Sequence, residues 1–147
     1  MTDTDGMVAW LRKAMDAAQR DAEAAARAFP DWEFDEFVNE IRDVPNAGTV
    51  AYVPVPEYGP HISRQSPAAV LRRIAADRKI LDELHPSTTQ IINPGYGKHV
   101  ADFGCVTCHD WDGVTEGYGY CPTVRALAEG YGWTEGAAST GEIQALT

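Results

Sequence analysis

The stretch CVTCHDWDGVTEGYGYCPT, residues 105–123, contains all three cysteines of the 147-residue chain. Its first five residues match the C-x-x-C-H sequence of a covalent haem attachment site. Its full length, C-x2-C-x12-C, instead supplies three thiols with spacing typical of a zinc site. An odd number of cysteines argues against a disulfide framework. The stretch therefore decides whether the C-terminal half is organised around a covalently attached haem or around a zinc ion bound directly by the cysteines.

The N-terminal sequence bears on this choice. MTDTDGMVAW, residues 1–10, begins acidic where a secretory signal begins basic, and no apolar run approaches the ~20 residues needed to cross a bilayer. We therefore expect a cytoplasmic protein without a membrane segment. Haem attachment needs export to an oxidising compartment, whereas a reducing cytosol keeps thiols available to a metal. Zinc is the favoured interpretation, with Cys105, Cys108 and Cys121 as ligands.

Cys121 has a second property that suits a ligand. It precedes Pro122, and proline is favoured at the first position of a helix, so a short helix is predicted from here to about Gly130. The free amides and the dipole at a helix N-terminus lower the pKa of a cysteine and favour the thiolate that binds a metal.

The fourth ligand has several candidates. His85 is favoured, because it is expected at the end of a helix and on its buried side, where a hydrogen bond can orient the ring. His61 is the second choice, and either histidine can also be read as an ordinary hydrogen-bonded core residue. The remaining candidates are His99 in an expected loop over residues 86–104, His109 directly after Cys108, and the carboxylates Asp110 and Asp112.

Two further segments predict helices. Residues 7–29 contain good helix formers and no interior glycine or proline, with an apolar stripe that starts at Val8. Ser66-Pro67 combines a capping hydroxyl with a proline at the first helical position, so a central helix is predicted to start there. This helix should reach about His85 and end before Pro86.

A β segment lies between these helices. Residues 32–55 are predicted to form a β-hairpin or small meander, in which residues 49–55 are the clearer strand and residues 32–44 also fit a helical face. The chain is therefore expected to be α+β. We expect one zinc-stabilised domain over residues 1–133, with an N-terminal helix, a β-hairpin, a central helix and a zinc knuckle, followed by a flexible tail over residues 134–147.

Three motifs carry a resemblance to a known family. HISRQSPAAVLRR (61–73), RKILDELH (78–85) and C-x2-C followed by CPTVR (121–125) resemble an uncharacterised domain-of-unknown-function family of actinobacteria and their phages. The resemblance covers roughly residues 7–130 and implies the same order of helix, β segment, helix ending in histidine, and cysteine knuckle. It favours His61 and His85 among the histidines. This chain departs from it in a longer first β arm and a Gly/Tyr loop before Cys121, and no activity follows from the resemblance.

Charge limits the partners that the protein can attract. The net charge of −10 opposes binding to nucleic acid or anionic lipid, so we expect a protein partner, no nucleic acid and no membrane. One basic window interrupts the acidic chain, and we interpret it as the solvated face of a helix. It contains Arg64, Arg72, Arg73, Arg78 and Lys79.

These observations favour a non-enzymatic interaction or regulatory module whose acidic surface engages a protein partner. The resemblance to a family of actinobacteria and their phages also allows the protein to be phage-encoded. One alternative is a nucleic-acid-binding zinc protein that uses the basic window with Trp111, Tyr118 and Tyr120 as stacking groups. Another is a zinc-dependent hydrolase with Asp110 or Asp112 beside an open metal position. The H-E-x-x-H and deaminase motifs are absent from the sequence, and thiolate-rich ligation is more typical of a structural centre.

Overall fold

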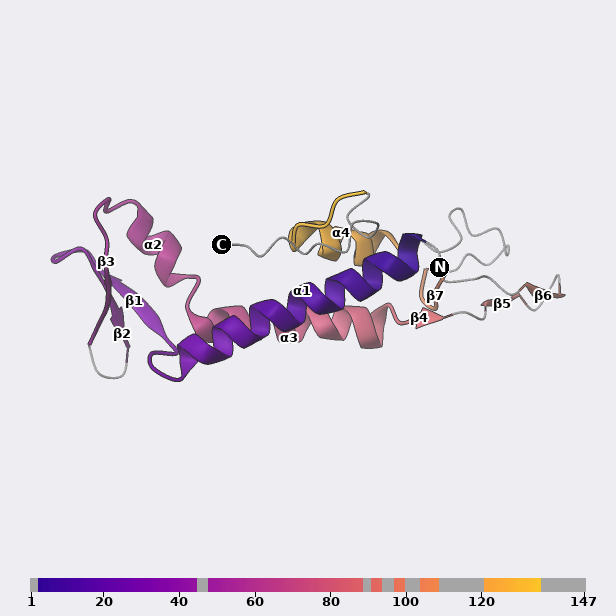
Figure 1. Ribbon diagram of the computed structural model, residues 1–147, viewed down its shortest axis with the longest axis horizontal. Helices are drawn as coiled ribbons and strands as arrows, with labels where there is room; N and C mark the ends of the chain where they lie inside the picture. The colour runs from indigo at the N-terminus through magenta and orange to yellow at the C-terminus, as the bar shows by residue number, and fades with distance from the viewer. Residues whose placement is uncertain are drawn as a thin grey trace. The chain divides into compact units, whose positions relative to one another are not determined.

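A computed structural model describes residues 3–44, 48–88, 91–93, 97–99, 104–108 and 121–135. It combines helices with antiparallel strands, which confirms the α+β class (Figure 1). The chain divides into two compact units, and the divisions fall within the first and third helices. We call residues 16–76 the sheet unit, and residues 1–15 together with 77–147 the cluster unit.

The N-terminal helix, α1, runs from Asp3 to Ala26 and so begins and ends a few residues before the predicted 7–29. It ends early because the carbonyl of Ala25 accepts hydrogen bonds from the amides of both Ala28 and Phe29, at 3.2 Å each, and the chain turns there. The predicted apolar stripe is confirmed at its start. Within the cluster unit, the stripe residues Val8, Leu11 and Met15 are buried, and so is the neighbouring Met7.

The sheet unit contains a three-stranded antiparallel sheet in the order β1-β2-β3, with β1 at Trp32–Asp35, β2 at Glu40–Asp43 and β3 at Thr49–Tyr52. This confirms the meander. The ambiguous residues 32–44 form its first two strands, which pair with Phe34 opposite Ile41. Ile41 is fully buried and also pairs with Ala51, so it is the central side chain of the sheet.

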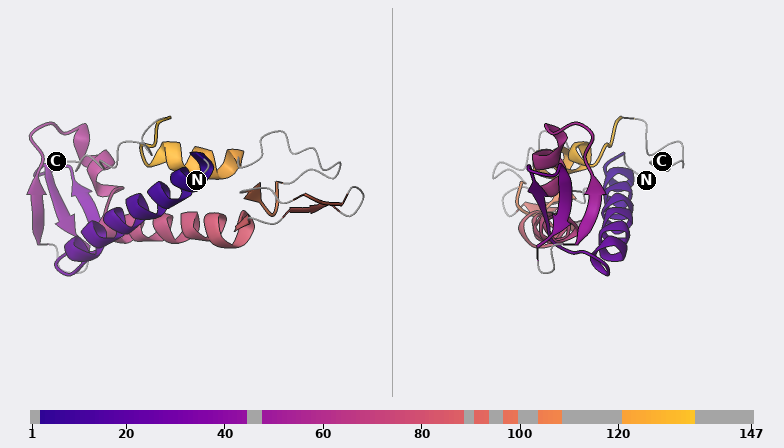
Figure 2. Two further views of the ribbon diagram at one scale, coloured as in Figure 1. Left: turned by 45° about the vertical axis from the view of Figure 1, so that its right-hand side comes forward. Right: turned by 90° about the vertical axis from the view of Figure 1, so that its left-hand side faces the viewer.

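One helix in the sheet unit was not predicted. α2 (Tyr58–Ser63) follows a proline-rich segment and is only six residues long, so neither its length nor its composition carries a helical pattern. It packs against β1, as Figure 2 shows, and its buried Gly59 lies against the ring of Phe34. A side chain at position 59 would occupy the space that this ring fills.

The central helix, α3, runs from Pro67 to Lys79 and continues as a π-helix, η1, from Ile80 to Leu84. The amide of His85 donates to the carbonyl of Ile80 at 2.8 Å, five residues back, which closes the last wide turn. The predicted start at Ser66-Pro67 and the end before Pro86 are confirmed, whereas the π-helical turn was not predicted.

The expected loop over residues 86–104 contains short strands instead. β4 (Ser87–Thr88) pairs with β7 (Gly104–Cys105), and β5 (Ile91–Asn93) pairs with β6 (Gly97–His99), both antiparallel. These strands were not predicted because each has only two or three residues, which is too short to show an alternating apolar and polar pattern in the sequence. The β4–β7 pair matters most, because it joins the end of η1 to the first cysteine.

The last helix, α4, runs from Pro122 to Gly130, as predicted. The buried apolar residues of the cluster unit beyond α1 come from η1, α4 and the segment that follows it, and they are Leu81, Val124, Ala128 and Trp133. The hydroxyl of Tyr131 donates a hydrogen bond to Asp77 at 2.8 Å.

Most of the predicted tail over residues 134–147 lies outside the described residues, and the domain boundary at residue 133 stays a prediction. None of the helices in the described part is both long and apolar enough to span a bilayer.

Substitution of Gly59 tests the packing of α2 on the sheet. A Cβ at this position overlaps the Phe34 ring, so we expect Gly59→Ala to lower the free energy of unfolding by about 1–3 kcal/mol. The matched control is Gly130→Ala at the end of α4, where no atom lies within 4 Å of the added Cβ. Urea unfolding of the two variants measures the difference. A Gly59→Ala protein as stable as the Gly130→Ala protein would contradict this packing.

Candidate metal centre

The side chain of His85 is positioned by the end of η1 and by the strand that follows. η1 ends at Leu84, and His85 leaves the helical conformation with φ −130° and ψ 54°. The next residues then hold the cysteine segment in place: Ser87 pairs with Cys105, and the amide of Val106 donates to the carbonyl of Pro86 at 3.0 Å. His85 and Cys105, 20 residues apart in sequence, are therefore fixed in the same piece of backbone structure.

Cys105 and Cys108 lie on a tight turn that begins in β7. The amide of Cys108 donates to Sγ of Cys105 at 3.4 Å, which is the amide-to-sulfur contact expected of a cysteine knuckle. The hydroxyl of Thr107 also donates to the carbonyl of Leu84, so the turn is attached directly to the end of η1. Cys105 is buried, whereas Cys108 is exposed.

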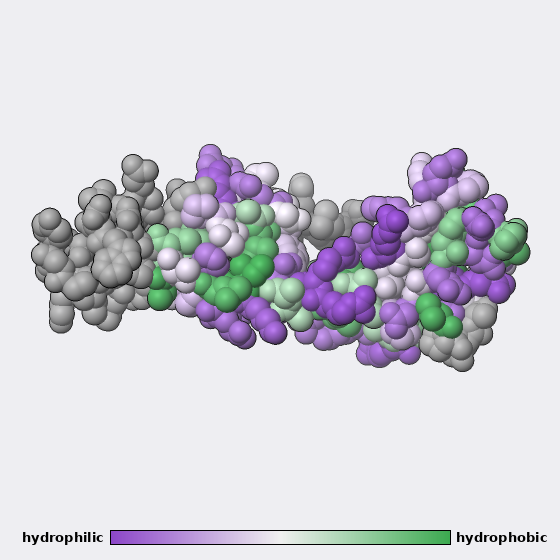
Figure 3. Space-filling view, turned by 180° about the vertical axis from the view of Figure 1, so that it is seen from behind, coloured by the Kyte–Doolittle hydropathy of each residue, from purple (hydrophilic) through white to green (hydrophobic). Residues whose placement is uncertain are grey.

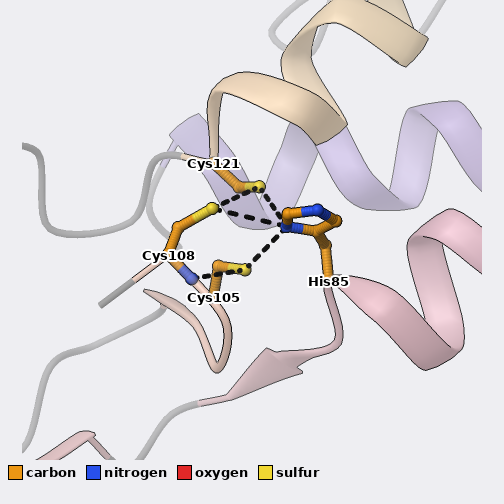
Figure 4. A group of neighbouring side chains, drawn as sticks. All are labelled: His85, Cys105, Cys108 and Cys121. Atoms are coloured by element: carbon orange, nitrogen blue, oxygen red, sulfur yellow. Dashed lines mark hydrogen bonds between the residues drawn. The ribbon is translucent and has the colours of Figure 1, made fainter. Parts of the chain in front are cut away.

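Cys121 is the residue immediately before α4. Its backbone is extended, with φ −112° and ψ 114°, and its carbonyl accepts the first helical hydrogen bond from the amide of Arg125 at 2.9 Å. Its side chain does not cap the helix and is 4% exposed. The Sγ atom is turned toward the other two cysteines and His85, as Figure 4 shows.

Four potential ligand atoms converge in this arrangement. Nδ1 of His85 lies 3.5 Å from Sγ of Cys105, 3.3 Å from Sγ of Cys108 and 3.5 Å from Sγ of Cys121 (Figure 4). The sulfurs of Cys108 and Cys121 are 3.6 Å apart, and all four atoms lie within 4.8 Å of one another. Three cysteines and one histidine are thus close enough to hold a metal ion.

These separations fit a tetrahedral ion. Bond lengths of ~2.3 Å to sulfur and ~2.0–2.1 Å to nitrogen, at tetrahedral angles, place a sulfur and a nitrogen about 3.6 Å apart and two sulfurs about 3.8 Å apart. The three nitrogen–sulfur separations and the Cys108–Cys121 sulfur separation, 3.3–3.6 Å, differ from these values by about 0.3 Å or less. Four of the six separations among these atoms therefore match a four-coordinate metal, and the other two, from Sγ of Cys105 to the sulfurs of Cys108 and Cys121, are within 4.8 Å.

The electrostatics of the sulfur cluster also bear on metal binding. Desolvation raises the pKa of the Cys108 thiol to about 12, and hydrogen bonds and charge repulsion from Cys121 and Cys105 act in the same direction. Part of Cys108 is exposed, but its sulfur faces the other ligand atoms (Figure 4). A bound divalent cation would offset the negative charge of a thiolate here. It would thereby lower the pKa of the coordinating thiols and deprotonate them.

The other predicted candidates are placed differently. His61 is exposed in α2 of the sheet unit and is not one of the four converging residues. His99 is the last residue of β6, where its backbone pairs with Ile91. His109, Asp110 and Asp112 lie outside the described residues. Within the described ranges, the group of His85 and the three cysteines is the one set of three or more potential ligands that comes together.

Substitution of the converging residues tests whether they act as ligands. We expect Cys105→Ser, Cys108→Ser, Cys121→Ser and His85→Ala each to reduce the metal retained after dialysis and to lower the stability of the metal-loaded protein by about 3 kcal/mol or more, because the binding energy of such a site is folding energy. His61→Ala is the matched control, since that histidine is exposed and not part of the group. Metal analysis and thermal unfolding measure both effects. Loss of metal in His61→Ala with full retention in His85→Ala would reverse the choice between the two histidines.

Comparison with known proteins places the chain in a family but assigns no activity. Neither a curated protein nor a solved structure matches it. A family of unknown function, DUF6221, matches residues 4–132, which include all four converging residues and nearly all of the described structure. The chain therefore belongs to the DUF6221 family.

Proposed function

We propose that this chain is a small zinc-binding protein in which the metal is structural, and that it works in the cytoplasm as a non-enzymatic interaction or regulatory module. The observation that carries the zinc site is the convergence of three sulfurs and one imidazole nitrogen within 4.8 Å. These atoms come from the end of η1, the knuckle and the start of α4, so a bound ion would join three segments that are distant in sequence.

Zinc suits this set of ligand atoms better than haem does. Thiolate and imidazole groups in a tetrahedral arrangement are the usual ligands of structural zinc. Covalent haem attachment would instead require Cys105 and Cys108 to face a porphyrin. Here both sulfurs face His85 at 3.5 and 3.3 Å, which supports a shared metal ion.

The number of potential protein ligands supports a structural role for the metal. A catalytic zinc keeps one position open for water, whereas four protein ligands fill a tetrahedron. His85 and the three cysteines supply those four. This favours the non-enzymatic interpretation over the zinc hydrolase, which would have to open a position by releasing one of them.

Metal content gives the direct test of this site. We expect the purified protein to contain about one zinc per chain and to show no haem absorbance, because four suitable ligand atoms already lie at zinc-like separations. Elemental analysis and an absorption spectrum on the same sample measure both. A well-folded protein with less than about a tenth of an equivalent of zinc would contradict the proposal.

The nucleic-acid alternative rests on the basic window. Arg72, Arg73 and Lys79 are exposed on α3, and Arg73 donates to Gln65. Acidic residues on α3 and η1 bind other partners: Asp82 forms an ion pair with Arg12 at 2.7 Å, and Asp77 accepts a hydrogen bond from Tyr131. The net charge of −10 still opposes the approach of a polyanion, and we propose a protein partner instead.

A mobility-shift assay at ~50 mM salt, with single- and double-stranded DNA and RNA, separates these alternatives, because low salt favours electrostatic binding. We expect no saturable binding. Micromolar binding that falls steeply with salt would replace the protein-interaction proposal with the nucleic-acid one, provided that the double variant Arg72→Ala plus Arg73→Ala makes the slope of log affinity against log salt shallower by roughly one to two.

A further inference from the structure

Exposed apolar side chains are concentrated in one part of the sheet unit. Of the eight large apolar residues that are exposed in the described part of the chain, six lie between residues 37 and 58. Phe37 is 91% exposed and Tyr52 is 77% exposed. Figure 3 shows apolar residues among hydrophilic ones over this unit, toward the right of the view. Apolar residues gathered in this way commonly mark an interaction site.

Strand register brings several of these residues to one end of the sheet. Phe37 and Val38 occupy the turn between β1 and β2. Tyr52 pairs with Glu40, the first residue of β2 after that turn. Val44 follows β2 at the opposite end, where its amide donates to the carbonyl of Asp31. We call Phe37, Val38 and Tyr52 the hairpin tip.

The backbone of the hairpin tip is held in place. Oδ1 of Asp35 accepts a hydrogen bond from the amide of Phe37 at 3.0 Å. Asn39 adopts the left-handed conformation, with φ 52°, which asparagine tolerates better than most residues. Its carbonyl accepts from the amide of Val53 at 2.8 Å, which joins the turn to the end of β3. Phe37 is therefore presented by an ordered turn, and binding would cost little additional ordering.

The segment that contains the hairpin tip is strongly acidic. Residues 31–57 contain seven acidic residues and one arginine, which gives a net charge of −6. That arginine, Arg42, already forms ion pairs with Glu40 at 3.1 Å and Asp35 at 3.7 Å. Glu33, Glu36 and Glu57 are exposed. The field around Phe37 therefore attracts a positively charged surface and repels nucleic acid and anionic lipid.

We propose that the hairpin tip is a docking site for a basic partner protein, with Phe37 as the aromatic anchor that enters an apolar pocket of the partner. This inference rests on the proposed interaction function and assigns it a surface and a class of partner. In many interfaces an aromatic side chain that becomes buried in the complex supplies most of the affinity. The charged residues around it accelerate association and select the partner.

A displayed library of random peptides, selected on the full-length zinc-loaded protein, supplies the probe. We expect the selected peptides to combine lysine or arginine with apolar residues. For a synthetic peptide of this kind, Phe37→Ser should weaken binding by about tenfold or more, as loss of an anchor does. Binding should also weaken as salt rises from ~50 to ~500 mM, and less steeply in Glu33→Gln plus Glu36→Gln.

The matched control is Val44→Ser, because Val44 is 53% exposed but lies at the other end of the sheet. Both variants should keep wild-type zinc content and melting temperature, since neither side chain is buried. Peptides that bind the Phe37→Ser protein as tightly as the wild type would contradict the hairpin tip as the docking site. They would still support the proposal of an interaction module. Failure to select any peptide would overturn both. Neutral or acidic peptides, or a concentration-dependent dimer that Phe37→Ser abolishes, would overturn the basic partner.

Discussion

The convergence of three cysteine sulfurs and one imidazole nitrogen in a small volume is the constraint around which the described C-terminal part of this protein is organised. The sulfurs of Cys105, Cys108 and Cys121 lie within 4.8 Å of one another and of Nδ1 of His85, and burial, together with the two neighbouring sulfurs, raises the pKa of the Cys108 thiol to about 12. Only a bound cation makes three thiolates favourable in so small a volume. A zinc ion there would offset their charge and, at the same time, hold the end of η1, the knuckle and the start of α4 together.

The two units differ in how their structures are specified. In the described part of the cluster unit, two of the buried apolar side chains outside α1, Cys105 and Cys121, are also proposed metal ligands, so the proposed site would form part of the core of this unit. The sheet unit has no cysteine, and its strands are organised by the buried Ile41 and by hydrogen bonds of the buried Asp43 with Gly48. The proposed metal site in one unit and the exposed aromatic hairpin tip in the other are the features on which the proposed binding role rests.

Local patterns explain how much of this could be predicted from the sequence. Pairs such as Ser66-Pro67 and Cys121-Pro122 place helix starts accurately, because proline restricts the backbone whatever the tertiary context. The position of His85 at the end of the central helix was predicted. The π-helical turn and the β4–β7 pair, which bring His85 to Cys105, were not predicted. Both depend on hydrogen bonds between residues whose side chains carry no periodic pattern. α2 was missed because six residues containing a proline give no helical signal.

X-ray absorption spectroscopy of the purified protein at the zinc edge tests the central claim most directly, because it measures the identities and distances of the metal's ligands. The geometry of the four converging residues predicts about three sulfur atoms at ~2.3 Å and one nitrogen at ~2.0–2.1 Å. A first shell dominated by oxygen and nitrogen, or one with more than four ligands, would contradict the proposed site.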